Sequence, residues 1–87
     1  MSYQIVYHES VMKKDIAKID RPVKAAIKKA IEEKLTVDPI AFGKPLQYSL
    51  KGHRRLRIGD DRVIYEIFET ELTVVILTIG HRREVYD

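Results

Sequence analysis

The chain has 87 residues, 45% of them hydrophobic and 33% charged, with a net charge of +3 and no cysteine. This length predicts one small domain over residues 1–87, and the composition excludes a disordered chain, disulfides and thiolate chemistry. No apolar run approaches the roughly 18 residues of a membrane span and the start lacks a signal-peptide pattern, so we expect a cytoplasmic protein without membrane contact.

The N-terminal half predicts one strand followed by two helices. Residues 3–8 alternate and are rich in aromatic and β-branched side chains, which is typical of a strand. Apolar residues then recur at three- and four-residue spacings over 9–19 and over 21–36. Asp20 is a candidate N-cap, and Pro22 suits the first turn of the second helix. We therefore expect an antiparallel helical hairpin.

The C-terminal half predicts an antiparallel meander after a loop over residues 40–50. Its expected strands are 53–58, 62–69 and 72–79, separated by turns that contain glycine or acidic residues. The last strand is apolar on both faces, as a central strand covered by helices would be. If the first strand joins this sheet and the helices pack on one face, the fold class is α+β.

A meander would bring several basic residues to one end of its sheet. His53, Arg55 and Arg57 alternate onto one face of their strand. In such a meander, the strand over 62–69 begins at the turn that follows residue 58. The strand over 72–79 ends at the same level of the sheet. The residues expected to meet there are Arg57, Arg62, His81 and Arg82, with Arg55 one step further in. Arginine offers a planar fork that matches phosphate oxygens.

These residue types favour RNA cleavage without a metal. The sequence shows no paired carboxylates, nucleophile elbow, glycine-rich phosphate loop or metal-ligand spacing, so we expect no metal and no cofactor. A base would take the 2′-hydroxyl proton, arginines would stabilise the phosphorane, and an acid would protonate the 5′-oxygen. The expected products carry a 2′,3′-cyclic phosphate and a 5′-hydroxyl. His81 or Tyr86 could transfer protons, although each could equally be a solvated or packing residue.

Two motifs carry a family resemblance. The segment LRIGDDRVIY at 56–65, followed after roughly fifteen residues by GHRREVY at 80–86, resembles the RelE/ParE superfamily of bacterial toxins, and most of all its RelE branch. The resemblance covers nearly the whole chain. It implies a type II toxin that cleaves mRNA in the A site of the 70S ribosome and inhibits translation. It also implies an acidic cognate antitoxin that wraps the toxin and contacts operator DNA itself.

The resemblance also implies site residues by position. The expected catalytic residues are Arg55, Arg62, His81, Arg82 and Tyr86. The expected RNA-binding residues are Lys44, Lys51, His53, Arg54, Arg57 and Arg83. Lysines that several family members carry on the second strand are replaced here by His53 and Arg55. Because arginine is a poor general base, proton transfer is expected to move to His81 or Tyr86.

Two other interpretations stay open. A ParE-like toxin shares the fold, poisons DNA gyrase and lacks the nuclease cluster. A non-enzymatic basic module would bind RNA or an acidic protein through the same charges. The cluster of Arg55, Arg62, Arg82 and Tyr86 favours the nuclease over both.

Overall fold

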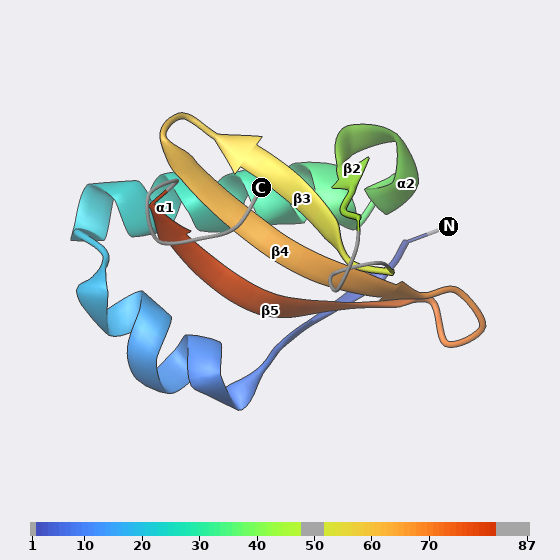
Figure 1. Ribbon diagram of the computed structural model, residues 1–87, viewed down its shortest axis with the longest axis horizontal. Helices are drawn as coiled ribbons and strands as arrows, with labels where there is room; N and C mark the ends of the chain where they lie inside the picture. The colour runs from blue at the N-terminus through green and yellow to red at the C-terminus, as the bar shows by residue number, and fades with distance from the viewer. Residues whose placement is uncertain (1, 48–51, 82–87) are drawn as a thin grey trace.

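The computed structural model describes residues 2–47 and 52–81, which form a five-stranded sheet with helices on one face (Figure 1). The strands lie in the order β1 (Gln4–Tyr7), β5 (Thr73–His81), β4 (Asp61–Phe68), β3 (Arg54–Ile58) and β2 (Lys44–Pro45). Strand β1 runs parallel to β5, and the other neighbours are antiparallel. The predicted meander and the α+β class are confirmed.

Two helical arms follow β1, as the periodicity predicts. The first arm consists of the π-helical turn η1 (Val11–Asp15) and the 3-10 turn η2 (Ile16–Lys18). The second arm is α1 (Arg21–Ala30), which continues into the π-helical turn η3 (Ile31–Leu35). Asp20 occupies the N-cap position as expected, although its side chain accepts no capping hydrogen bond. No helix in residues 2–47 and 52–81 is long and apolar enough to cross a membrane.

The main core lies between these arms and one face of the sheet, here called the helix face. Its buried residues from the sheet are Leu56, Val63, Tyr65, Val74, Ile76 and Ile79, and those from the arms are Val11, Ile27, Ile31 and Leu35. Burying each large apolar side chain contributes about 1.5–3 kcal/mol. On the other face, here called the open face, Leu46 and Ile64 form a smaller cluster with Leu77. A strand residue in the main core lies on the helix face, and a strand residue in the smaller cluster lies on the open face. Since side chains alternate along a strand, the face of each neighbouring residue follows.

The predicted loop over residues 40–50 contains two short elements that the sequence did not predict. The turn α2 (Pro39–Phe42) begins at Asp38, whose Oδ1 accepts a hydrogen bond from the Ala41 amide at 3.1 Å. Strand β2 has two residues and pairs Lys44 with Arg55. Elements this short depend on tertiary pairing, because their own residues carry no periodic pattern.

A clamp of two side chains fastens α2 to the sheet. The Tyr65 hydroxyl donates to the Pro39 carbonyl at 2.6 Å, and burial raises the pKa of this phenol above its ordinary value. Nη2 of Arg54 donates to the carbonyls of Ile40 and Gly43, at 2.6 and 2.8 Å. We call Arg54 and Tyr65 the α2 clamp. It sets the position of β2, and with it the position of the basic residue on β2.

Substituting Gly43 with alanine should destabilise the fold by about 1–3 kcal/mol. A Cβ at this position would lie 1.8 Å from the Tyr65 hydroxyl oxygen, so the clamp must shift to make room. Urea unfolding measures the loss. The matched comparison is the same substitution in a Tyr65→Phe background, where the closest contact is absent and the loss should shrink. An equal loss in both backgrounds would show that the clamp does not set this packing.

Candidate functional site

The basic residues of the open face lie in rows across three strands. Along β3, Arg55 and Arg57 alternate with Leu56, which is buried on the helix face, so both arginines lie on the open face. Arg57 lies directly opposite Arg62 of β4, and Arg62 lies opposite Gly80 of β5. The predicted meeting of Arg57 and Arg62 at one end of the sheet is therefore confirmed.

A second and a third row continue the same surface. Lys44 of β2 lies opposite Arg55, which lies opposite Ile64 of β4. In the third row, Nε2 of His53 is 3.7 Å from Oε1 of Glu66 on β4. We call this surface the cationic face. Its basic members are Lys44, His53, Arg55, Arg57 and Arg62.

The pair of Arg57 and Arg62 is the most informative feature of the cationic face. Like charges directly opposite each other on two strands repel and destabilise the sheet. Arg62 is also only 4% exposed, and enclosing a guanidinium removes hydration from its charge. Two forked donors at facing positions can share the oxygens of one phosphate. An arrangement of this kind can bind phosphate.

His81 lies at the predicted end of the sheet but on the opposite face. It pairs with Asp61, and Ile79, two residues earlier on β5, is buried in the main core. Alternation therefore turns His81 toward the helix face, away from Arg62. The pocket beside it is also lined by one lysine and four aspartates, namely Lys18, Asp15, Asp20, Asp60 and Asp61. The meander predicted from the sequence places His81 correctly at the end of β5. The burial of Ile79 in the main core shows on which face of the sheet His81 lies.

Arg54 departs from its expected role in RNA binding. Its side chain lies on the helix face, where Nη2 donates to two carbonyls of the α2 segment. The physical reason is the alternation of β3, which separates Arg54 from Arg55. Glu66 lies on the open face although the sequence did not predict it there, and the signal for this face is its alternation with Ile64 along β4. Four further expected site residues lie outside the described part of the chain: Lys51, Arg82, Arg83 and Tyr86.

Among residues 2–47 and 52–81, no group of three or more His, Asp or Glu side chains is placed to hold a metal ion. The cationic face offers forked donors, one amine, one imidazole and one carboxylate. Such a set can bind and orient a phosphodiester and stabilise negative charge that develops on it.

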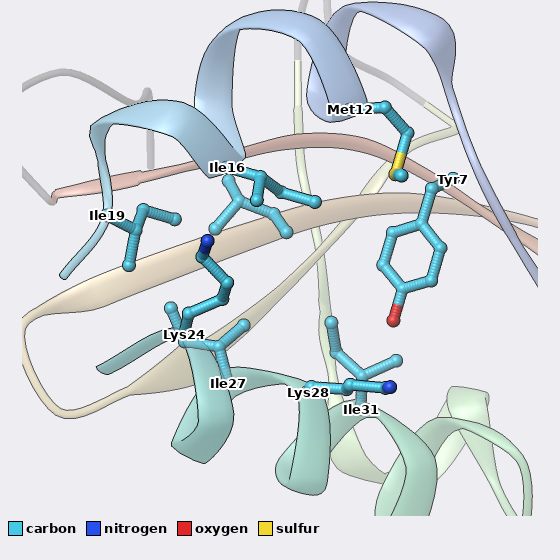
Figure 2. A pocket seen from close by; sticks show the side chains of 9 residues that line it. Tyr7, Met12, Ile16, Ile19, Lys24, Ile27, Lys28 and Ile31 are labelled. Atoms are coloured by element: carbon cyan, nitrogen blue, oxygen red, sulfur yellow. The ribbon is translucent and has the colours of Figure 1, made fainter. Parts of the chain in front are cut away.

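A second concave feature lies between the two helical arms. Figure 2 shows this hairpin groove, which encloses about 270 Å³ beneath the first arm and beside α1. Its lining is mostly apolar and comprises Tyr7, Met12, Ile16, Ile19, Lys24, Ile27, Lys28, Ile31 and Ile79. Met12 remains 57% exposed. Burial, with a smaller contribution from the Glu32 carboxylate, raises the pKa of Tyr7.

Comparison with known proteins gives consistent matches. A family model described as the ParE toxin of the type II toxin-antitoxin system parDE matches residues 5–86. Toxin RelG of Mycobacterium tuberculosis is 34% identical over 74 residues, which is 85% of each chain. A chain from the RelBE2 toxin-antitoxin complex of the same organism has a TM-score of 0.89 and 30% identity, covering 94% of this chain and 93% of that one. The isolated Escherichia coli RelE toxin shares the fold, with a TM-score of 0.74 and 18% identity over 92% of this chain and 84% of its own.

Arg54 and Arg57 should respond differently to truncation. Arg54→Ala removes two hydrogen bonds from a charged donor and should lower the free energy of unfolding by about 2 kcal/mol or more. Arg57→Ala removes an exposed cation that repels Arg62, so stability should stay within about 0.5 kcal/mol or rise. Chemical denaturation of the two variants checks this contrast. Equal destabilisation would contradict the division between the α2 clamp and the cationic face.

Proposed function

Because this chain belongs to the RelE/ParE superfamily and is the toxin of a type II toxin-antitoxin system, we propose that it is a ribosome-dependent endoribonuclease. It would cleave mRNA in the A site of the 70S ribosome and so inhibit translation. The observation that carries the proposal is the opposed pair of Arg57 and Arg62, with Arg55 in the next row. Three guanidiniums on one sheet face suit a phosphodiester whose charge grows during cleavage.

The proposed chemistry is an attack by the 2′-hydroxyl on the adjacent phosphorus. Arg55 and Arg62 hold the non-bridging oxygens, and Arg57 binds the neighbouring backbone. The products carry a 2′,3′-cyclic phosphate and a 5′-hydroxyl. The family resemblance adds Arg82 as a further phosphate contact and Tyr86 as a proton-transfer residue. His81 lies on the helix face, so we leave it out of the group that contacts the phosphate.

The proposal assigns substrate positioning to the ribosome. A catalyst built mainly from guanidiniums lacks a way to distort a flexible RNA strand by itself. Holding the 2′-oxygen in line with the leaving 5′-oxygen supplies a large part of the barrier reduction in such reactions. The ribosome would provide that alignment by fixing the codon. Little cleavage of naked RNA is therefore part of the proposal.

The proposed protein partner is an acidic cognate antitoxin that wraps the toxin and covers the hairpin groove. Solved neighbours of this chain include toxin-antitoxin complexes, such as RelBE2 of Mycobacterium tuberculosis. The groove combines an apolar lining with Lys24 and Lys28, which suits an amphipathic segment with carboxylates at its edge (Figure 2). Contact with operator DNA would come through the antitoxin alone.

A ParE-like toxin that acts on DNA gyrase is the second candidate function. The observation that favours it is the description of the matching family model, which is that of ParE. The opposed guanidiniums favour the nuclease, because a protein-binding surface has no need for two like charges directly across a strand pair. The two activities differ in their nucleic-acid product, so one cellular assay separates them.

Arg55→Ala and Arg62→Lys should each reduce cleavage of ribosome-bound mRNA by about 10²-fold or more. Arg62→Lys keeps the buried charge but loses the forked donor geometry. Primer extension on ribosomes with a defined A-site codon measures the rate, and Lys29→Ala, on the exposed side of α1, is the matched control. Undiminished cleavage by folded Arg55→Ala/Arg62→Lys protein would reject this site. Gyrase-linked DNA breaks with intact mRNA would move the protein to the second candidate function.

Met12→Glu should weaken antitoxin binding about 10-fold or more, because it places a carboxylate in the groove that an acidic segment must enter. Calorimetry with the cognate antitoxin measures the Kd. The control is Val37→Glu, which adds the same charge at a position that is 64% exposed and outside the groove lining. Equal Kd values for the two variants would remove the groove from the proposed interface.

A further inference from the structure

A carboxylate of the first arm is bonded to the backbone of β5 near the cationic face. Oδ2 of Asp15 accepts a hydrogen bond from the amide of Ile79 at 2.9 Å, in a partly buried position. The two residues are 64 positions apart in the sequence, so tertiary structure alone brings them together. A hydrogen bond to an ionised acceptor is stronger than one between neutral groups. The contact therefore fastens the first arm to the end of β5.

The Ile79 amide lies where β5 has lost its neighbour on one side. Strand β1 pairs with β5 as far as Tyr7, which lies opposite Ile76, and the chain then enters the first arm. Between Ile76 and Thr78 the register of β5 against β4 shifts by one residue. A shift of this kind bends a strand and disrupts its hydrogen-bond ladder. Asp15 supplies an acceptor to β5 directly after this irregularity.

The bonded segment is next to the guanidiniums of the proposed site. Gly80, which follows Ile79, lies opposite Arg62, and Arg62 lies opposite Arg57. Because Gly80 has no side chain, the backbone of β5 itself is the neighbour of Arg62 across this strand pair. Arg62 is enclosed, so a displacement of that backbone would change the space that its guanidinium occupies.

We propose that Asp15 is a positioning residue of the nuclease, an inference that rests on the proposed function. By holding the Ile79 amide, Asp15 fixes the end of β5 beside Arg62. The chain continues from this strand end into Arg82, the further phosphate contact of the proposed chemistry. Asp15 lies in the first arm, on the helix face, so it acts through the strand and not on the RNA. A displacement of about 1 Å in a positioned site can cost about 10²-fold in rate.

Asp20 offers a matched comparison for Asp15. Both aspartates line the pocket beside His81, so both contribute negative charge to this end of the molecule. The Asp20 side chain makes no capping hydrogen bond at the start of α1, whereas the Asp15 side chain bonds to Ile79. Alanine at either position removes one negative charge from the pocket. The difference between the two variants therefore measures the hydrogen bond rather than the charge.

Hydrogen exchange of the Ile79 amide, followed by NMR without ribosomes, tests the contact itself. Asp15→Ala should speed exchange of this amide by about 10-fold or more, because a hydrogen bond to a charged group is lost. Asp15→Asn keeps a carbonyl oxygen as acceptor and should retain most of the protection. Asp20→Ala should leave the exchange rate unchanged. Equal exchange in Asp15→Ala and wild type would overturn the inference, whatever the nuclease assay gives.

Single-turnover cleavage of ribosome-bound mRNA tests the positioning role. Asp15→Ala should lower the maximal rate by about 10-fold, with little change in the ribosome concentration that gives half of it. Asp15→Asn should recover most of the loss, and Asp20→Ala should cleave at the wild-type rate. Thermal unfolding of each variant sets an assay temperature at which all of them are folded.

A double-mutant cycle separates positioning from a general loss of stability. If Asp15 acts through the row of Arg62, its effect on the rate should shrink in an Arg62→Lys background and persist in an Arg55→Ala background. Equal effects in both backgrounds, or wild-type cleavage that Asp15→Ala leaves unchanged, would overturn the inference and leave the nuclease intact. Absence of cleavage by wild type itself would overturn the proposed function and, with it, this inference.

Discussion

The α2 clamp is the interaction on which the candidate site depends. Tyr65 and Arg54 hold the carbonyls of Pro39, Ile40 and Gly43, and this fixes a segment with almost no regular structure of its own. Strand β2 follows directly from that segment and pairs through Lys44 and Pro45. Without the clamp, the cationic face would end at β3. A core tyrosine and a strand arginine therefore set the width of a surface to which neither contributes a side chain.

The cationic face gathers guanidiniums at facing and neighbouring positions of two strands. Arg57 and Arg62 lie opposite each other and repel, and Arg62 is enclosed. The single carboxylate of the third row, Glu66, lies beside His53 rather than between these arginines. This distribution of charge suits the phosphodiester ligand that we propose.

The sequence predicted the order of the strands and helices and which basic residues share a face, because both follow from strict periodicities. It did not predict α2 and β2, whose few residues are held by contacts from distant strands. Alternation already separated Arg54 from Arg55, yet Arg54 was predicted to contact RNA together with the other basic residues of this segment. The face of His81 depends on a register shift at Ile64 and Tyr65, which no local pattern reveals. Positions that depend on how distant strands pair therefore could not be predicted from the sequence.

The chemical identity of the mRNA ends tests the central claim most directly. Wild-type protein added to 70S ribosomes with a defined A-site codon should leave a 2′,3′-cyclic phosphate on the upstream fragment and a 5′-hydroxyl on the downstream one. Those ends follow from attack by the neighbouring 2′-hydroxyl on a phosphate held by guanidiniums. A 3′-hydroxyl paired with a 5′-phosphate would require attack by water, and it would contradict the account.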